Sequence, residues 1–249
     1  MAQLALITGA AVRIGKAMAL HLARSGFSVA IQYRSSKEEA EATVAAIQEL
    51  GVEGACFQVG LAEHAEVEAL FPAVNRAMGQ VTCLINNASS FADDRIESMT
   101  EEGWDKHMAI NLKAPVFLAQ AFTAQLSGGE TGNIINIIDQ RVLRPNPYFF
   151  SYTLSKSALW AATKTMAQGL APRIRVNAIG PGPALPSVYQ SAEDFEHESR
   201  STVLGHGTTP EEIANAVSFI LNSPAMTGQM IALDGGQHLL WQTPDIRVT

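Results

Sequence analysis

The chain has 249 residues, of which 47% are hydrophobic and 16% charged, and its formal net charge is −7. This composition is typical of a globular protein and excludes a disordered chain. A negative charge without blocks of like charge argues against nucleic acid or an anionic membrane surface as the main partner.

No apolar run reaches the roughly 18 residues that a membrane span needs, and no basic segment of a signal peptide precedes the first apolar run. The two cysteines, Cys56 and Cys83, match neither a metal-binding nor a disulfide pattern, so no metal is expected. We therefore expect a cytoplasmic protein.

Strand and helix patterns alternate along the chain. Short apolar runs predict strands at 3–8, 27–33, 55–59, 81–86, 133–138, 173–179 and 229–233. Helical patterns lie between them at 15–24, 36–50, 64–78, 100–126, 151–170 and 210–221. Ser36 is a candidate helix cap, and Gly26 is placed to end the first helix.

This alternation predicts an α/β fold with a single domain over residues 1–249. The domain is a doubly wound, Rossmann-type parallel sheet of about seven strands with helices on both faces. Ligands of such sheets bind beyond the carboxyl ends of the strands, so we expect the functional site at that edge.

The segment TGAAVRIG, residues 8–15, joins the first strand to the first helix, which is the context of a dinucleotide-binding turn. Gly9 permits a tight turn, and Gly15 lets the helix pack close to the strand. The helix N-terminus offers free N–H groups to a pyrophosphate. Arg13 replaces the usual middle glycine, and its guanidinium could pair with a phosphate or lie in solvent.

The end of the second strand distinguishes between cofactors. NAD sites commonly carry an acid there to hold the ribose 2′-hydroxyl. This chain has Tyr33, Arg34 and Ser35 instead. An arginine and a hydroxyl suit a 2′-phosphate, so the sequence predicts NADP(H).

Tyr152 and Lys156 are four residues apart, on one face of a predicted helix that follows the strand ending near Asp139. A nearby ammonium is expected to lower the phenol pKa from about 10, so that Tyr152 can exchange a proton at neutral pH. An exposed amphipathic helix would show the same spacing.

Pro115 lacks an N–H group, so the carbonyl of Asn111 loses its helical partner. That carbonyl could hold a water, or the proline could simply kink the helix.

Asp139 bears on the substrate. A hydroxyl at this position would stabilise the developing negative charge of a ketone oxygen, whereas a carboxylate would repel it. An acid suits a C=N bond, whose nitrogen gains a proton as its carbon gains hydride. Asp139 could relay that proton with Tyr152, bind the N–H groups of a pterin-like ring, or only form a turn.

Taken together, the motifs resemble the short-chain dehydrogenase/reductase family over nearly the whole chain. They are TGAAVRIG, the NNAS of residues 86–89, Asn111, Tyr152-x-x-x-Lys156, Gly180-Pro181-Gly182 and Asp234-Gly235-Gly236. The resemblance implies catalytic roles for Asn111, Asp139, Tyr152 and Lys156, with Asn111 linking a relay water to the lysine. It implies a cofactor site of Gly9, Arg13, Ile14, Gly15, Tyr33, Arg34, Ser35, Asn87, Ala88, Ser89, Tyr152, Lys156, Pro181 and Gly182.

Within that family, Arg13, the run at 33–35, NNASSF at 86–91 and Asp139 resemble pteridine and dihydromonapterin reductases. This implies that Phe91 stacks on a flat heterocycle, although it could be a core residue. The implied substrate site is Arg13, Ser89, Phe91, Asp139 and Tyr152. Two positions depart from most members: Asp139 replaces a catalytic serine, and Gly60 replaces an acid near the adenine.

The preferred function is NADPH-dependent reduction of the C=N bond of a dihydropterin-like substrate. The alternatives are ketone or enone reduction and NADP(H) sensing without turnover. The family implies a homotetramer, to which the apolar helix at 151–170 and the tail with Trp241 and Pro244 could contribute. Residues 183–208 are expected to form an irregular loop that closes over the substrate.

Overall fold

The structure, a computed structural model, describes residues 3–126, 129–187 and 189–243. Within these residues one parallel sheet contains seven strands in the order β3-β2-β1-β4-β5-β6-β7. They are β1 (Leu4–Thr8), β2 (Ser28–Tyr33), β3 (Gly54–Gln58), β4 (Cys83–Asn86), β5 (Gly132–Ile137), β6 (Ile174–Pro181) and β7 (Met230–Leu233). The predicted Rossmann-type sheet is confirmed.

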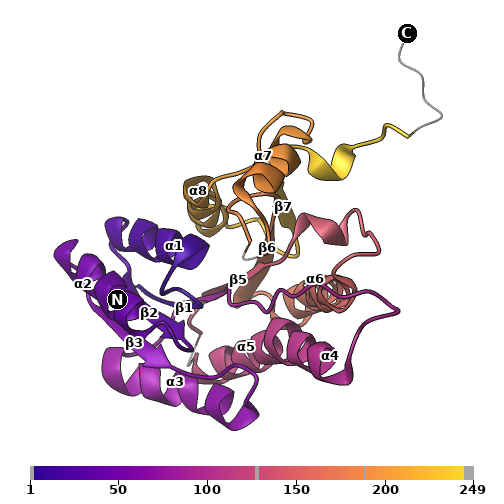
Figure 1. Cartoon of the computed structure of the whole chain (residues 1–249). Helices are drawn as coiled ribbons and strands as arrows, with labels where there is room; N and C mark the ends of the chain where they lie inside the picture. The colour runs from indigo at the N-terminus through magenta and orange to yellow at the C-terminus, as the bar shows by residue number, and fades with distance from the viewer. Residues whose placement is uncertain (1–2, 127–128, 188, 244–249) are drawn as a thin grey trace.

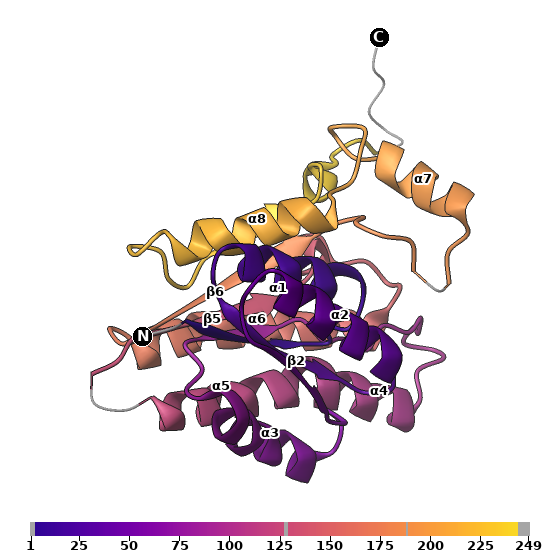
Figure 2. The ribbon, with the colours of Figure 1, turned by 90° about the vertical axis from the view of Figure 1, so that its left-hand side faces the viewer.

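Helices cover both faces of the sheet (Figures 1 and 2). One face carries α1 (Arg13–Arg24), α2 (Lys37–Glu49) and α8 (Pro210–Leu221). The other carries α3 (His64–Met78), α4 (Glu101–Met108), α5 (Ala114–Gln125) and α6 (Phe150–Leu170). No helix among the described residues is long and apolar enough to cross a membrane.

The central strands read as continuous apolar runs because both of their faces are buried. Ile7 points into the core under α1 and α8, whereas its neighbour Leu6 points into the core under α3 and α5. In the second core the rings of Phe71 and Phe122 lie 6.2 Å apart. Adjacent β1 and β4 lead to helices on opposite faces, so the crevice of a doubly wound sheet opens beyond their carboxyl ends.

The helix predicted at 100–126 is not continuous. A π-helical segment, Ala109–Lys113, separates α4 from α5. Pro115 lies in the first turn of α5, where a missing N–H needs no helical partner. The proline therefore lies where the π-helical segment passes into α5.

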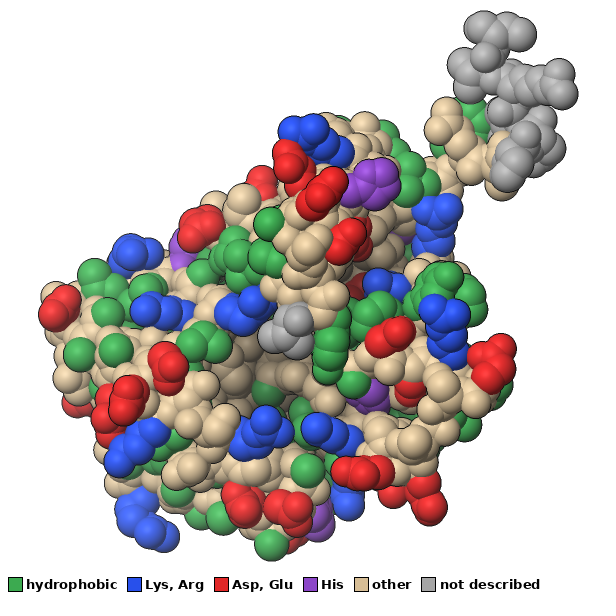
Figure 3. All heavy atoms as spheres, viewed as in Figure 1, with side chains coloured by type: hydrophobic (Ala, Val, Ile, Leu, Met, Phe, Trp, Pro, Cys, Tyr) green, Lys and Arg blue, Asp and Glu red, His purple; other side chains and the backbone are tan. Residues whose placement is uncertain are grey.

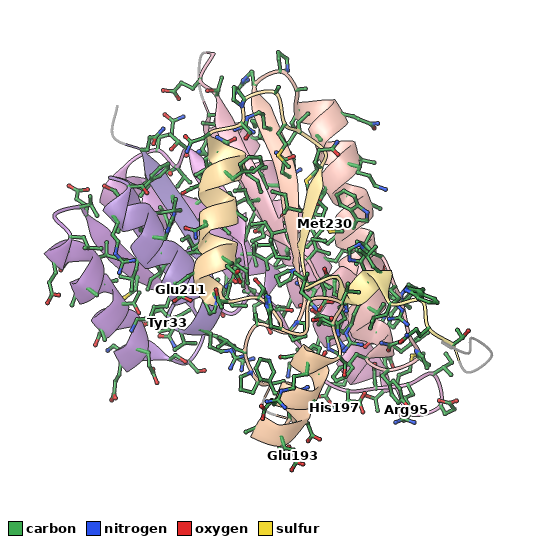
Figure 4. The ribbon with its side chains drawn as sticks, turned by 90° about the horizontal axis from the view of Figure 1, so that it is seen from above. Tyr33, Arg95, Glu193, His197, Glu211 and Met230 are labelled. Carbon is green, nitrogen blue, oxygen red and sulfur yellow. The ribbon has the colours of Figure 1, made fainter. Side chains whose placement is uncertain are left out.

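The prediction that 183–208 is irregular was wrong for its central part, which forms α7 (Ala192–Arg200). A capping box starts this helix: Ser191 Oγ accepts from the Asp194 N–H at 3.0 Å, and Asp194 Oδ2 accepts from the Ser191 N–H at 3.3 Å. Figure 4 shows α7, which carries Glu193 and His197, projecting beyond the sheet. The helix was missed because it is polar and buries no apolar stripe.

Of the two predicted helix ends, one was confirmed and the other was confirmed only in position. Ser36 precedes α2 as predicted, but its side chain makes no capping hydrogen bond. Gly26 follows the end of α1 with a φ of 87°, which confirms its predicted place. Pro244, which was expected to reach a neighbouring subunit, lies outside the described residues.

Candidate active site

The turn after β1 is held by a side chain from the neighbouring strand. Oε1 of Gln32 accepts from the Gly9 N–H at 2.9 Å, and its Nε2 donates to the Val59 carbonyl at 2.6 Å. Gly9 and Arg13 both have positive φ, at 63° and 56°. Gln32 was not singled out from the sequence, because a polar residue in an apolar strand gives no sign of its partners.

Gly15 lies where α1 approaches the ends of β1 and β4. A side-chain carbon at this residue would lie 2.7 Å from Cα of Ala10 and 2.8 Å from Nδ2 of Asn87. Thr8 joins the two loops, since its Oγ1 accepts from the N–H groups of Asn87 and Ala88 at 2.9 and 3.0 Å. The glycine turn and the start of the β4 loop therefore form one rigid unit.

A cleft of about 890 Å³ opens at the carboxyl ends of the strands. Figure 3 shows this face of the molecule hollowed near its centre, with Lys and Arg side chains around the hollow. The cleft is lined by every predicted cofactor and substrate residue; of the predicted site residues, Asn111 alone does not line it. Their placement around one cleft is observed, whereas their individual roles stay predictions.

The lining of the cleft fits NADP(H). The first residues of α1 line the cleft behind the Gly9 turn, and no side chain of Val12 caps their N–H groups, which suits a pyrophosphate. At the end of β2 the lining residues are Tyr33, Arg34, Ser35 and Ser36, which include a cation and three hydroxyl groups but no acid. A 2′-phosphate is accommodated there more readily than a free 2′-hydroxyl.

The predicted acid, phenol and ammonium meet on the floor of the cleft. The hydroxyl of Tyr152 donates to Oδ2 of Asp139 at 2.8 Å, and Oδ1 of Asp139 accepts from the Arg141 N–H at 2.8 Å. Nζ of Lys156 donates to the carbonyl of Ile137, at the end of β5, at 2.8 Å. Tyr152 and Lys156 are buried, and Asp139 is half-buried at the surface of the cleft.

The sequence predicted that Lys156 would lower the pKa of Tyr152, but in this structure that pKa is raised. Burial, together with the charge and hydrogen bond of Asp139, raises the pKa of Tyr152 well above its usual value. Burial also raises the pKa of Asp139 and lowers that of Lys156 to about 8. Tyr152 is thus a neutral phenol that donates to the acid, because burial and the charge of Asp139 both oppose the loss of its proton.

Asn111 lies in the π-helical segment behind the cleft and is fully buried. Its Oδ1 accepts from the Ser90 N–H at 2.8 Å, and its Nδ2 donates to the Ser90 carbonyl at 2.9 Å and to Ser155 Oγ at 3.0 Å. The side chain therefore joins the β4 loop to α6. This contact was not expected, because the sequence argument concerned the carbonyl of Asn111.

Aromatic rings form one wall of the cleft. Phe91 stacks on Phe149 with ring centroids 4.3 Å apart, and it meets Tyr152 edge-on at 4.8 Å. The guanidinium of Arg141 lies 4.9 Å from the centre of the Phe149 ring. Phe149 has a left-handed backbone, with φ at 52°. Phe149 was not predicted, because its backbone conformation leaves no signal in the sequence. Arg141 was missed with it, because its contact is with the Phe149 ring.

The far wall comes from the segment after β6. Nη2 of Arg13 donates to the carbonyl of Pro186 at 2.9 Å, so it holds this segment against the glycine turn. Glu198 on α7 accepts from Gln190 at 2.6 Å and from Gln237 at 3.1 Å.

Gly60 stands where most members of the family carry an acid. Its N–H donates to Glu66 at 2.6 Å.

This fold and this cleft define a nucleotide-dependent oxidoreductase of the short-chain class. A family model described as enoyl-(acyl carrier protein) reductase matches residues 9–238. The chain therefore belongs to the short-chain dehydrogenase/reductase family, as the motifs predicted.

Several relatives are similar over almost their whole length. The chain is 46% identical to FolM alternative dihydrofolate reductase 1 from Brucella suis, solved with NADP; 98% of each chain is covered and the TM-score is 0.95. It is 34% identical to the 3-oxoacyl-[acyl-carrier-protein] reductase FabG of Staphylococcus aureus, over 96% of this chain and 99% of the relative. It is 30% identical to the angucycline C-6 ketoreductase LanV with bound NADP, with 95% and 96% covered and a TM-score of 0.88. The predicted cofactor, NADP(H), is confirmed.

Proposed function

We propose that the protein is an NADPH-dependent reductase of a C=N bond in a dihydropterin-like substrate. The observation that carries the proposal is the hydrogen bond from Tyr152 to Asp139 on the floor of the cleft. An ionised acid at this point would repel the negative oxygen that forms when a ketone accepts hydride. It would not oppose reduction of a C=N bond, whose nitrogen ends the reaction protonated.

The bound cofactor supplies the hydride. Asp139 and Tyr152 together hold the proton that the substrate nitrogen receives. Burial raises the pKa of Asp139, so the carboxylate that accepts from Tyr152 takes up a proton at a higher pH than an exposed aspartate and can relay it to the substrate nitrogen. Tyr152 then donates to the carboxylate that remains, as it does in the structure.

The walls of the cleft suit a flat, polar heterocycle. Phe91 lines the cleft within 4.8 Å of the Tyr152 ring, so a substrate that reaches the acid also reaches an aromatic side chain. Ser89 and Arg13 line the same cleft. The similarity to FolM alternative dihydrofolate reductase 1, at 46% identity, supports a pterin ring in the substrate.

The second candidate is an NADPH-dependent ketone or enone reductase. It is favoured by similarity to FabG at 34% identity and to the ketoreductase LanV at 30%. In that case a protonated Asp139 would donate a hydrogen bond to the substrate oxygen. NADP(H) sensing without turnover is a weaker candidate because the phenol, the acid and the lysine are all present in one cleft.

The test is NADPH oxidation with dihydrobiopterin, dihydromonapterin and dihydrofolate, beside a panel of ketones and enones. We expect turnover of a dihydropterin compound by the wild type and a loss of at least about a hundredfold in Asp139→Ser. Asp105→Ser, in exposed α4, is the matched control and should retain wild-type rates. Turnover of carbonyl compounds alone by the wild type would overturn the C=N proposal.

We further propose that the protein is a homotetramer. Leu154 on α6 is 38% exposed in the single chain, whereas Leu159 on the same helix is buried in the core. An apolar helix face left open in one chain supports packing against a second copy. Light scattering at micromolar concentration tests this assembly, and a monomeric mass would refute it.

A further inference from the structure

A chain of hydrogen bonds runs beneath the aromatic wall and connects three elements. Ser151 is the second residue of α6. Its N–H donates to Oδ1 of Asp94 at 3.0 Å, and its hydroxyl donates to Oδ2 of Asp94. Ser151 Oγ lies 2.6 Å from Nδ1 of His107 on α4. Nε2 of His107 lies 3.3 Å from the N–H of Ala92.

The donors and acceptors in this chain fix the proton on the imidazole. The hydroxyl of Ser151 donates to Oδ2 of Asp94, so its proton is not available to His107. Ser151 Oγ must then accept from Nδ1–H of His107. The N–H of Ala92 can only donate, so Nε2 must carry a lone pair. His107 is therefore neutral and protonated at Nδ1, the single form in which every contact is satisfied.

The surroundings of His107 favour the neutral form. Its side chain is 1% exposed, and Ser151 is fully buried. Burial lowers the pKa of His107 below its usual value. Among nearby groups, Asp94 and the Gly103 backbone raise the pKa and Lys106 lowers it, and these effects are smaller than that of burial. From α6 the ring faces Ser151 and the neutral Tyr152, at a ring distance of 6.2 Å.

Two members of the chain, Ala92 and Ser151, are next to residues of the cleft. Ala92 follows Phe91, which contacts Tyr152 and Phe149. Ser151 precedes Tyr152, whose hydroxyl meets Asp139. His107 itself does not line the cleft. It can therefore affect the reaction only by holding the residues on either side of it in place.

We propose that His107 is a positioning residue whose neutral, Nδ1-protonated ring ties the Phe91 loop (residues 87–95) to the start of α6. Protonation of Nε2 places two N–H groups against each other at Ala92 and loosens the Phe91 loop beside Phe91, while Asp94 still holds the end of the loop to Ser151. The proposal concerns how the cleft is held, so it applies to a dihydropterin and to a carbonyl substrate alike.

The first test is ¹⁵N NMR of the wild-type protein labelled only in histidine, without substrate. We expect one histidine to be neutral and protonated at Nδ1 at pH 7, and its signals to be absent from His107→Asn. If the signals that disappear in His107→Asn belong to a ring protonated at Nε2, or on both nitrogens, at pH 7, the proposal is overturned whatever the substrate is.

The second test separates the two hydrogen bonds of the ring. In His107→Asn the amide can still donate to Ser151 but cannot reach Ala92, so we expect KM for substrate to rise about tenfold with kcat little changed. In His107→Gln the longer side chain can accept from Ala92 but leaves Ser151 without its donor, so kcat should fall about tenfold. NADPH oxidation with dihydrobiopterin, or with whichever carbonyl compound is turned over, gives both parameters.

The third measurement is the pH dependence of KM. In the wild type, KM should rise as pH falls through the pKa of His107, whereas both variants should lack this rise. His64→Gln, on α3 and away from the cleft, should behave as the wild type. Wild-type values of kcat and KM at all pH values in both His107 variants would overturn the proposal. If either variant fails to fold, the NMR measurement on the wild type still decides.

Discussion

The hydroxyl of Tyr152 and the carboxyl group of Asp139 are 2.8 Å apart, with the phenol as donor. Such a pair shares one transferable proton, and neither group titrates independently of the other. The first prediction concerns this proton. Tyr152→Phe preserves the ring that contacts Phe91 but removes the donor, so NADPH turnover should fall about 10²- to 10⁴-fold.

The measurement is kcat on the substrate found in the screen, with NADPH binding followed by fluorescence. Binding of NADPH should change far less than kcat. A variant that reduces substrate at the wild-type rate would show that Tyr152 takes no part in proton transfer.

The second prediction concerns the choice of cofactor. Arg34 is exposed at the end of β2 and lines the cleft. In Arg34→Glu the new carboxylate can accept from a ribose 2′-hydroxyl and repels a 2′-phosphate. The Kd for NADPH should rise about 10- to 100-fold, with a smaller effect on NADH.

Arg24→Glu is the matched control, since Arg24 is exposed at the end of α1 and does not line the cleft. Because the lost contact is ionic, the difference between wild type and Arg34→Glu should shrink at high salt. Equal effects of the two substitutions would exclude a specific contact of Arg34 with the phosphate.

The third prediction concerns stability and pH. Burial raises the pKa of Asp139 above its usual value, so the unfolded chain loses this proton at a lower pH than the folded protein. The resulting stability is fully present below the unfolded pKa and is lost as pH rises through the folded pKa. The isosteric Asp139→Asn lacks this loss and should be more stable than wild type at pH 7.

Urea unfolding of the cofactor-free protein between pH 4 and pH 8 measures the effect. The gap in unfolding free energy between Asp139→Asn and wild type should widen with pH and then level off. A gap that stays constant across this range would mean that burial does not shift the pKa of Asp139.

The fourth prediction compares two glycines. In Gly15→Ala the added carbon meets Ala10 and Asn87 at less than 3 Å, so the turn must open; both stability and NADPH binding should fall. Gly169 is exposed on α6 and has open space around its Cβ position. Gly169→Ala should therefore raise the unfolding free energy by about 0.5 kcal/mol. Equal unfolding free energies for the two variants would contradict the close contact at Gly15.

The sheet and the main cleft residues could be predicted because both depend on local patterns. Apolar runs marked the strands, and the spacing of Tyr152 and Lys156 placed them on one helix face. The sequence offered Asp139 as a possible proton relay with Tyr152, and the two groups do form a hydrogen bond. It could not show that Asp139 rather than Lys156 dominates the surroundings of the phenol, because contacts across the cleft depend on tertiary packing.

Residues that act through others were also missed. Gln32 holds the Gly9 turn, and Phe149 packs on Phe91 from a left-handed backbone conformation. Neither feature has a spacing or a composition that distinguishes it in the sequence. His107 is a similar case, since its importance depends on Ser151, which is 44 residues away in the chain.

The π-helical segment between α4 and α5 controls the relative rotation of these two helices. The N–H of Ala114 donates to the carbonyl of Ala109, five residues earlier, so this turn holds one residue more than an α-helical turn. Each residue turns a helix by about 100°. The extra residue lets α4 direct His107 toward α6 while α5 directs Phe122 into the core. Deleting one residue from 109–113 would put the two helices out of phase and disturb the cleft and the core together.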